Sequence, residues 1–492
     1  MHPEQGPQHL KFGGGVSDTV LNPAVLVVVL IAGILLLIWP RKKACIVFLS
    51  AALLIPMDQV LLIAGVHFPM LRVLILFGIA RVFKEGVSSK RPLFSGGINK
   101  IDIAVILLTV VVAINSIILF QEFGAVVNEL GSIYTVFGVY FLLRFLIRDE
   151  DDIVRAIRTL AWVAAFVAII MTFEFTTGRN PYGLLGGANA HFYSQLAVRD
   201  DKFRAQAGFG HSILAGTFGA VLVPLFVALW WKGKDHRRIV ALGLLSATVI
   251  TLTSNSSTPM LAYAAGILAL SLWPVRAWMR AIRWGIVVIL VTLHLAMKAP
   301  VWNLIARIDL AGGSSGYHRF MLIDQCIRHF WDWWLIGVKD TSVWGWDMWD
   351  TANQYVGLCD GSGLVPFVLF IAILVYGFKY LGRARRQAGK DRVNALFLWA
   401  ISAALFANVV AFIGISYFDQ TIVGWYGLLA IISTAAAAPA KKEWPRTQVL
   451  PVPDTEFSGI QTTAQEDIAS PVQHGAESLD TDPWRSVRTN TI

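Results

Sequence analysis

Arg204 is the residue whose type and position most clearly point to chemistry. It stands just before a glycine-rich turn, and the apolar segment 211–231 begins directly after that turn. Gly208 and Gly210 allow the chain to turn tightly there without a side-chain clash. A guanidinium at the mouth of a membrane helix can hold a phosphate or a diphosphate, and the helix N-terminus adds a positive dipole. The alternative is an interfacial arginine that only reaches lipid headgroups.

A second concentration of candidate residues lies in the stretch 299–362, which is rich in tryptophan. Tryptophan prefers the membrane–water interface, and this preference alone can explain the enrichment. The indole ring also offers a flat face on which a sugar can stack. We therefore treat Trp344 and Trp346 as candidate glycan-binding residues. The tryptophans of this stretch are Trp302, Trp331, Trp333, Trp334, Trp344, Trp346 and Trp349.

Within that stretch, the pattern over 317–335 predicts an amphipathic helix in the membrane plane. His318, Arg319 and Arg328 supply its polar side. The two arginines could point at a lipid diphosphate, or equally bind lipid headgroups with no further purpose. Asp350 follows, and a carboxylate there could act as a general base on a sugar hydroxyl or merely pair with an arginine.

The composition shows which elements must position these residues. Of the 492 residues 56% are hydrophobic and 15% are charged, whereas a soluble domain carries about 25% charged residues. This excludes an ordinary cytosolic enzyme, a disordered protein and a disulfide scaffold. We predict an all-α polytopic membrane protein with 12 or 13 spans, because about 20 apolar residues cross a bilayer. The runs are 23–39, 44–64, 67–83, 102–120, 131–147, 156–174, 211–231, 239–253, 258–274, 282–298, 363–379, 394–415 and 421–437.

The second of these runs, 44–64, is interrupted by Pro56 and Asp58, so we expect it to be broken or re-entrant.

The positive residues predict the orientation. If the loops alternate, 30 lysines and arginines fall on one side and ten on the other, and the richer side is cytoplasmic. The loops 175–210 and 299–362 then face outward. A polar segment 1–22 precedes the membrane region 23–437, and the proline-rich stretch 438–492 is expected to be a disordered cytoplasmic tail. The net charge of +9 fits this topology better than nucleic-acid binding.

Two further residue sets give weaker signals. Cys326 and Cys359 share the second outer loop and could pair in an oxidising compartment, which the sequence leaves open. Asp200 and Asp201 have no further ligand spacing around them, so we expect no metal and no other cofactor.

Taken in order, four segments resemble the O-antigen ligase and polysaccharide polymerase superfamily of bacterial membrane proteins. Segment 204–211 is similar to the family's Arg-x-x-Gly-aromatic stretch that opens a helix. Segment 252–257 resembles its Leu-Thr-x-Ser turn, without the usual arginine. Segment 319–337 resembles its arginine-containing loop helix, and 353–364 its His-Asn-x-aromatic-Leu motif.

The resemblance implies a metal-independent inverting glycosyltransferase of the bacterial inner membrane. Its donor would be a polyprenyl-diphosphate-linked oligosaccharide at the periplasmic face, and its acceptor a glycan or glycolipid. Arg204 and Arg319 would contact the diphosphate, with Arg328 as a third contact, while Asn353 and Tyr355 would face the glycan. Membrane lipids and other polysaccharide-assembly proteins would be its partners, with no nucleic acid.

One departure leaves the activity open. Ala352 stands where family ligases carry a histidine before the motif asparagine, so the base falls to Asp350 or His318. The chain then resembles a polymerase as well as a ligase. A transporter or flippase of a lipid-linked glycan or anion, and a non-catalytic subunit of a polysaccharide assembly complex, are the alternatives. Charges are sparse within the spans, which favours surface chemistry over passage.

Overall fold

The described part of the chain is mostly helical and contains only two short pairs of strands, which confirms the all-α prediction. The predicted tail 438–492 and most of the polar segment 1–22 lie outside it. The computed structural model describes residues 19–56, 58–63, 65–88, 92–187, 196–199, 201–307 and 316–437. Its α-helices are α1 Pro23–Ile38, α2 Arg41–Leu54, α3 Met70–Ser88, α4 Lys100–Phe120, α5 Phe123–Leu146, α6 Glu150–Thr177, α8 Ser212–Trp230, α9 Arg237–Thr253, α10 Ser257–Ser271, α11 Met279–Ala296, α12 Gly316–Arg328, α13 Phe330–Trp333, α14 Gln354–Ser362, α15 Leu364–Gln387, α16 Arg392–Ala411 and α17 Thr421–Ala437.

Short 3-10 helices and strands connect these helices. The 3-10 helices are η1 Pro181–Leu185, η2 Lys234–His236, η3 Arg276–Trp278, η4 Val301–Arg307 and η5 Ser342–Trp344. The strands β1 Val60–Ile63 and β2 Val66–Pro69 form one antiparallel pair, and β3 Val198–Arg199 and β4 Lys202–Phe203 form another.

The helices have the length and composition of membrane spans, so a polytopic membrane protein is confirmed. Within the described residues, seven helices are long and apolar enough to cross a bilayer: α4, α5, α6, α8, α11 together with η3, α15 and α16. The helices α1, α10 and α17 are apolar but shorter. Each of the 13 predicted runs contains a helix, and the count of 12 or 13 spans stays a prediction.

The interrupted second run is indeed broken. Helix α2 ends at Leu54, and the chain then forms the β1–β2 hairpin. Pro56 lacks an N–H to continue the helix, so the polar backbone beyond it pairs between strands instead. The run predicted at 67–83 therefore starts as a strand, and α3 begins only at Met70.

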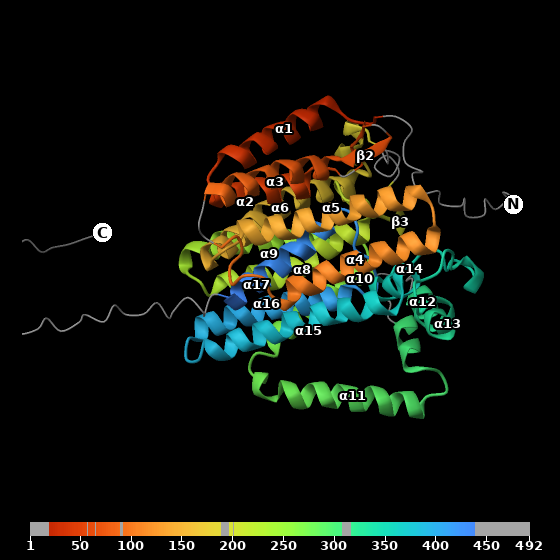
Figure 1. The fold of residues 1–492 in the computed structure, drawn as a ribbon. Helices are drawn as coiled ribbons and strands as arrows, with labels where there is room; N and C mark the ends of the chain where they lie inside the picture. Colours follow the sequence, from red (N-terminus) through yellow and green to blue (C-terminus); the bar gives the residue numbers. More distant parts are fainter. Residues whose placement is uncertain are drawn as a thin grey trace, which may run out of the picture. The chain divides into compact units, whose positions relative to one another are not determined.

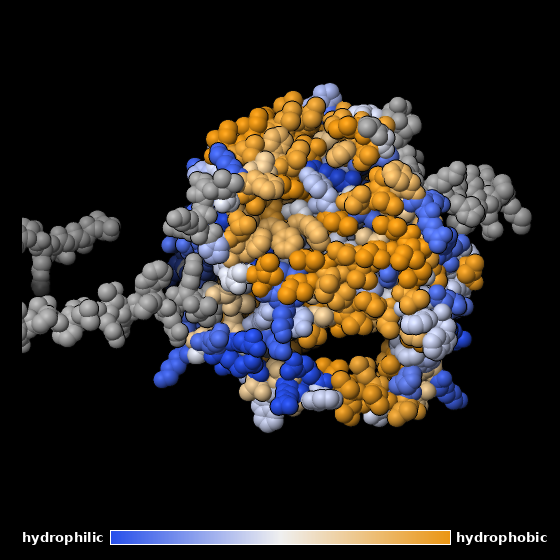
Figure 2. Space-filling view, in the orientation of Figure 1, coloured by the Kyte–Doolittle hydropathy of each residue, from blue (hydrophilic) through white to orange (hydrophobic). Residues whose placement is uncertain are grey.

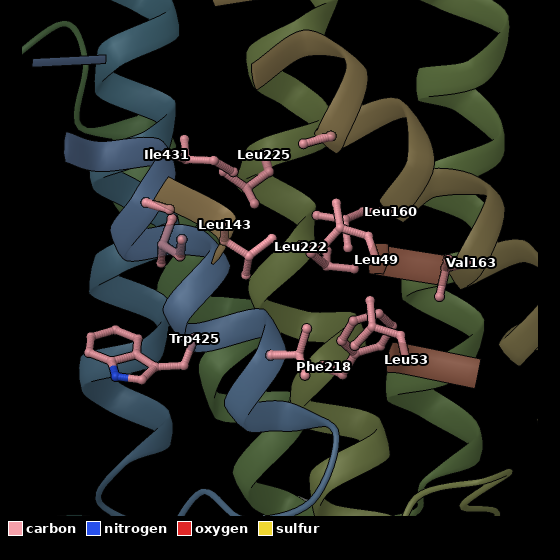
Figure 3. Close-up of a cluster of buried hydrophobic side chains, with 14 of the residues drawn as sticks. Leu49, Leu53, Leu143, Leu160, Val163, Phe218, Leu222, Leu225, Trp425 and Ile431 are labelled. Carbon is pink, nitrogen blue, oxygen red and sulfur yellow. The ribbon is translucent and has the colours of Figure 1, made fainter. Parts of the chain in front are cut away.

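Helix α8 lies at the centre of the helical packing. Gly216 and Gly219 allow this, because a Cβ at Gly216 would lie 2.3 Å from Ser254 Oγ and one at Gly219 2.8 Å from Ala247 O. Small residues let membrane helices approach closely. Apolar side chains from α2, α5, α6, α8 and α17 meet around it (Figure 3): Leu49, Leu53, Leu143, Leu160, Val163, Phe218, Leu222, Leu225, Trp425 and Ile431.

The described parts of the outer loops predicted from the charge pattern gather at one end of the helices. Figure 1 shows β2, β3 and α12 to α14 together there. Hydrogen bonds join them to the helix ends: Gln354 N–H donates to Phe412 O at 2.9 Å, and Asn115 Nδ2 donates to Ser362 O at 2.6 Å. We call this region the loop-rich end; its described residues are 55–56, 58–63, 65–69, 178–187, 196–199, 201–211, 254–256, 297–307, 316–363 and 412–420.

The amphipathic helix predicted over 317–335 is divided in two. Helix α12 ends at Arg328 and α13 begins at Phe330. The indole N–H of Trp333 donates to Cys326 O at 2.6 Å. This satisfies a carbonyl that a continuous helix would have bonded internally, so the break leaves that group paired.

At the opposite end, a buried ion pair joins α4 to α5. Arg144 Nε donates to Asp102 Oδ1 at 3.0 Å, and Nη2 donates to Oδ2 at 3.2 Å and to Gly97 O at 3.0 Å. Both side chains are fully buried. Asp102 also completes the capping box of α4 with Asn99.

We predict that Arg144→Ala destabilises the protein by about 3–5 kcal/mol, because it leaves Asp102 buried without its counter-charge. The measurement is thermal unfolding of the purified protein in detergent. Arg158→Ala removes an exposed arginine of α6 and is the matched control. Equal, small effects of both substitutions would contradict the assigned role of the pair.

Candidate functional site

Arg204 is held at the loop-rich end by its backbone and by one hydroxyl. Its N–H donates to Ala197 O at 2.9 Å, and Nη2 donates to Ser256 Oγ at 2.7 Å. The residue is only 9% exposed, and its Nε has no hydrogen-bond partner. Ser256 lies in the turn between α9 and α10. This buried guanidinium therefore keeps donor capacity that the described part of the protein does not use.

The carboxylate of Glu174, near the end of α6, anchors the segment that follows Arg204. It accepts hydrogen bonds from the N–H groups of Gln206 at 2.9 Å and Ala207 at 2.7 Å. Ala207 is held at φ 50°, in the left-handed region. Asn180 Nδ2 donates to Ala207 O at 2.8 Å. The strained turn is thus fixed from two elements, which sets the position of Arg204.

The far side of the same segment is fixed by the connection between α16 and α17. Gln420 Nε2 donates to Gly208 O at 2.7 Å, and Gly210 N–H donates to the Asp419 carboxylate. A Cβ at Gly208 would lie 2.8 Å from the Tyr182 ring. The glycine noted from the sequence is therefore required by close packing.

Arg319, on α12, lies in the same region as Arg204. It is 8% exposed, its Nε has no partner, and it forms no ion pair within the described residues. A Cβ at Gly414 would come within 3.0 Å of that Nε, so the guanidinium packs against the chain after α16.

Three arginines repel one another at this site. Burial, then Arg199, then Arg319 lower the pKa of Arg204 to about 10. Burial and Arg199 lower the pKa of Arg319 to about 10, and Asp350 opposes this. Repelling guanidiniums that are poorly hydrated favour an anion between them. We call Arg199, Arg204 and Arg319 the arginine cluster.

His211 borders the arginine cluster and caps α8. Its Nδ1 accepts the N–H of Ile213 at 3.1 Å. Burial, Arg204 and Arg199 lower the pKa of His211 to about 4. The imidazole is therefore neutral at physiological pH and adds no positive charge, while the N-terminus of α8 contributes its dipole.

The two candidate bases lie beside Arg319. His318 Nε2 is 2.8 Å from Asp347 O and 3.8 Å from its carboxylate. Partial desolvation raises the pKa of Asp350, while His318 and Arg319 oppose the rise. The structure thus brings Asp350 and His318 to the rim of the arginine cluster.

The remaining predicted residues lie elsewhere. Arg328 is nine residues from Arg319, or about two and a half helical turns, so it lies on the opposite face of α12. Its side chain is 68% exposed and pairs with Asp324 at 2.6 Å. The structure therefore does not bring Arg328 to the arginine cluster.

Three of the four predicted glycan-binding residues make contacts within the protein. Trp344 is buried and stacks on His329 with ring centroids 5.0 Å apart. Asn353 caps α14, and the Tyr355 hydroxyl donates to Val409 O at 2.9 Å. Trp346 is 89% exposed and its ring is open to a ligand.

Cys326 and Cys359 are both buried and free, and they lie in one apolar cluster between α12 and α14. Among the described residues, no three His, Cys, Asp or Glu side chains gather closely enough to hold a metal ion.

Several residues of this site were not selected from the sequence as contributors. Arg199 belonged to no motif, and Ser256 lay in the segment 252–257 that carries the resemblance but was not itself selected. Glu174 and Asp419 lie beside the ends of apolar runs, and a carboxylate at such a position was the available signal.

No family model matches this chain, and no curated protein matches it either. The fold and the site define an all-α polytopic membrane protein with a buried arginine cluster at its loop-rich end.

We predict that inorganic pyrophosphate stabilises the protein against heat in detergent, by about 1.4 kcal/mol at ten times its Kd. Arg204→Ala and Arg319→Ala should abolish the shift in Tm, because each removes one of the converging guanidiniums. Arg328→Ala should retain it, since that side chain lies outside the cluster. Equal shifts in all four proteins would contradict an anion site at these arginines.

Asp419 leads to a prediction about pH. Burial raises the pKa of Asp419 to about 7, and nearby Asp58 adds to the rise. The folded state then binds more protons than the unfolded state between about pH 4 and 7, so this group lowers stability as the pH rises through that window.

Asp419→Asn removes this titration and keeps an oxygen that can accept the Gly210 N–H. The Tm of the variant relative to wild type should therefore be higher at pH 8 than at pH 5. Asp151→Asn, an exposed carboxylate at the opposite end, is the control and should show no such trend. A pH-independent difference for Asp419→Asn would refute the assignment.

Proposed function

We propose that this protein is a metal-independent inverting glycosyltransferase. It transfers or polymerises an oligosaccharide linked to a polyprenyl diphosphate at the periplasmic face of a bacterial inner membrane. The observation that carries the proposal is the arginine cluster. Its guanidiniums come from β3 (Arg199), from the start of the 204–211 segment (Arg204) and from α12 (Arg319), and the Nε atoms of the last two have no hydrogen-bond partner among the described residues. The sequence resemblance supplies the substrate class, and the positive-inside pattern supplies the side of the membrane.

The position of the cluster suits a lipid-linked diphosphate. The diphosphate of such a donor lies at the membrane surface, while its polyprenyl chain remains among the acyl chains. Arg204 lies directly before a membrane-spanning helix, and Arg319 lies on a helix outside the spanning set. The guanidiniums of Arg204 and Arg319 therefore approach the membrane–water boundary from two different elements.

Glycosyl transfer from a diphosphate requires positive groups near the leaving group and a base near the acceptor. An acceptor hydroxyl attacks the anomeric carbon, the bond from that carbon to the diphosphate oxygen breaks, and the leaving diphosphate gains negative charge. Arginines fixed in advance stabilise that charge most in the transition state. The hydroxyl proton passes to a base, for which Asp350 and His318 are the candidates beside Arg319.

The test uses purified protein, a polyprenyl-diphosphate oligosaccharide and a chelator, with product length followed on a gel. Arg204→Ala and Arg319→Ala should each lower kcat about 10²–10³-fold, the loss seen when one donor to a developing oxyanion is removed. Arg328→Ala should stay near wild type. Asp350→Asn and His318→Gln separate the two candidate bases.

The product pattern decides the reaction. A ladder of longer glycans indicates a polymerase, and a single transfer that needs an added glycolipid indicates a ligase. Full turnover by Arg204→Ala and Arg319→Ala would refute the proposed role of the cluster. No turnover, with glycan crossing the bilayer of a liposome instead, would favour the transporter.

A further inference from the structure

Helix α11 is a membrane-length helix that has few packing partners along its sides among the described residues. The stretch Arg276–Ala296 has the length and hydropathy of a span, yet none of its residues is buried. Its main contacts are with its neighbours η3 and η4. Figure 2 shows an open gap between this helix and the rest of the surface, with apolar side chains on both sides. A gap of this kind in a membrane must contain lipid chains or another apolar occupant.

At the end of the gap where α11 begins, two arginines lie on two tryptophans. The guanidinium of Arg276 is 4.2 Å from the Trp273 ring, and that of Arg385 is 4.9 Å from the Trp399 ring. The two rings are in contact, with centroids 5.8 Å apart. Trp399 is fixed by its indole N–H, which donates to Ala269 O at 2.9 Å. The guanidiniums are therefore positioned by packed aromatic faces from the turn after α10 and from α16.

The charges at this place are not balanced within the described residues. Arg385 experiences repulsion from Arg276 and Arg386, and none of the three arginines forms an ion pair with a described carboxylate. The first turns of α11 add Arg280 and Arg283, which are exposed. The hydrophilic patch at this end of α11 and α15 is visible in Figure 2.

The surrounding side chains place this patch at the level of lipid headgroups. Tryptophan and arginine mark the membrane–water interface, and Trp278 and Trp284 flank the start of α11. Helix α15 leaves Val365, Val368 and Val375 exposed, at spacings that place them on one face. A molecule with a phosphate at one end and two long apolar chains at the other matches this combination of charge and surface.

We propose that an anionic phospholipid occupies the gap between α11 and α15, with its phosphate on Arg276 and Arg385 and its acyl chains along the apolar sides of the two helices. The lipid comes from the leaflet at the end opposite the loop-rich end, which is the cytoplasmic leaflet in the proposed orientation. This site is separate from the arginine cluster, and the proposal does not depend on glycosyl transfer. The lipid joins α11 to the other spans, since the protein itself supplies few contacts there.

The test is a titration of phosphatidylglycerol into the purified full-length protein in neutral detergent, with bound lipid counted by native mass spectrometry. The double variant Arg276→Ala/Arg385→Ala should bind phosphatidylglycerol at least tenfold more weakly than wild type. Phosphatidylcholine should bind wild type weakly, because it carries no net negative charge. Glycerol phosphate should compete poorly, because it lacks the acyl chains.

The control is Arg237→Ala/Arg238→Ala, which removes two positive charges at the same end, one of them over the Trp230 ring. It should bind phosphatidylglycerol within about twofold of wild type. Thermal unfolding without added lipid checks folding. Arg276→Gln/Arg385→Gln, which keeps much of each side chain but removes its charge, replaces the alanine pair if that pair unfolds. Equal losses in test and control variants, or equal binding of phosphatidylcholine, would overturn the proposal.

Discussion

The carboxylate of Glu174 is the group on which the geometry of the loop-rich end depends. It accepts hydrogen bonds from the backbone N–H groups of Gln206 and Ala207, which lie between Arg204 and the start of α8. A hydrogen bond to a neutral carboxyl oxygen contributes about 0.5–1.5 kcal/mol, and one to an ionised carboxylate contributes more. These hydrogen bonds offset the unfavourable left-handed conformation of Ala207, a conformation that glycine would adopt without strain. Helix α6 thus helps to fix the position of Arg204, which lies thirty residues after Glu174 in the chain.

The two ends of the protein treat positive charge differently. At the opposite end, Arg144 is matched by Asp102 within hydrogen-bond distance, so the pair is satisfied internally and joins α4 to α5. In the arginine cluster, Arg204 and Arg319 are almost as deeply buried but lack such a partner among the described residues. Burying an unmatched charge is costly, and a ligand that supplies the missing charge recovers that cost. The contrast between a matched and an unmatched guanidinium separates a structural role from a binding role.

The third arrangement of arginine, at the start of α11, lies between these two cases. Arg276 and Arg385 rest on tryptophan faces, and Arg276 is exposed while Arg385 is partly buried. Each guanidinium stacks on an aromatic ring near the end of its helix, which suits a headgroup at the interface rather than a buried substrate. If both proposals hold, one chain uses arginine for stability, for a buried anion site and for lipid contact, and the surroundings of each arginine decide which.

The sequence by itself determined the all-α membrane class, because runs of apolar residues near 20 long are specified by composition alone. It also marked Arg204 and Arg319 as candidates and indicated that the run at Pro56 would be interrupted. These features depend only on residues that are neighbours in the chain, so the sequence alone can reveal them.

Only the tertiary structure decided which side chains meet. It brought Arg199 to Arg204 and Arg319, and it placed Arg328 on the far face of α12. It used Asn353 and Tyr355 for capping and packing. It also left α11 without buried residues, although its hydropathy resembles that of its neighbours. The hydropathy of a segment indicates that it can form a membrane helix. Whether its side chains are buried depends on contacts with segments far away in the chain, and these cannot be read from the segment itself.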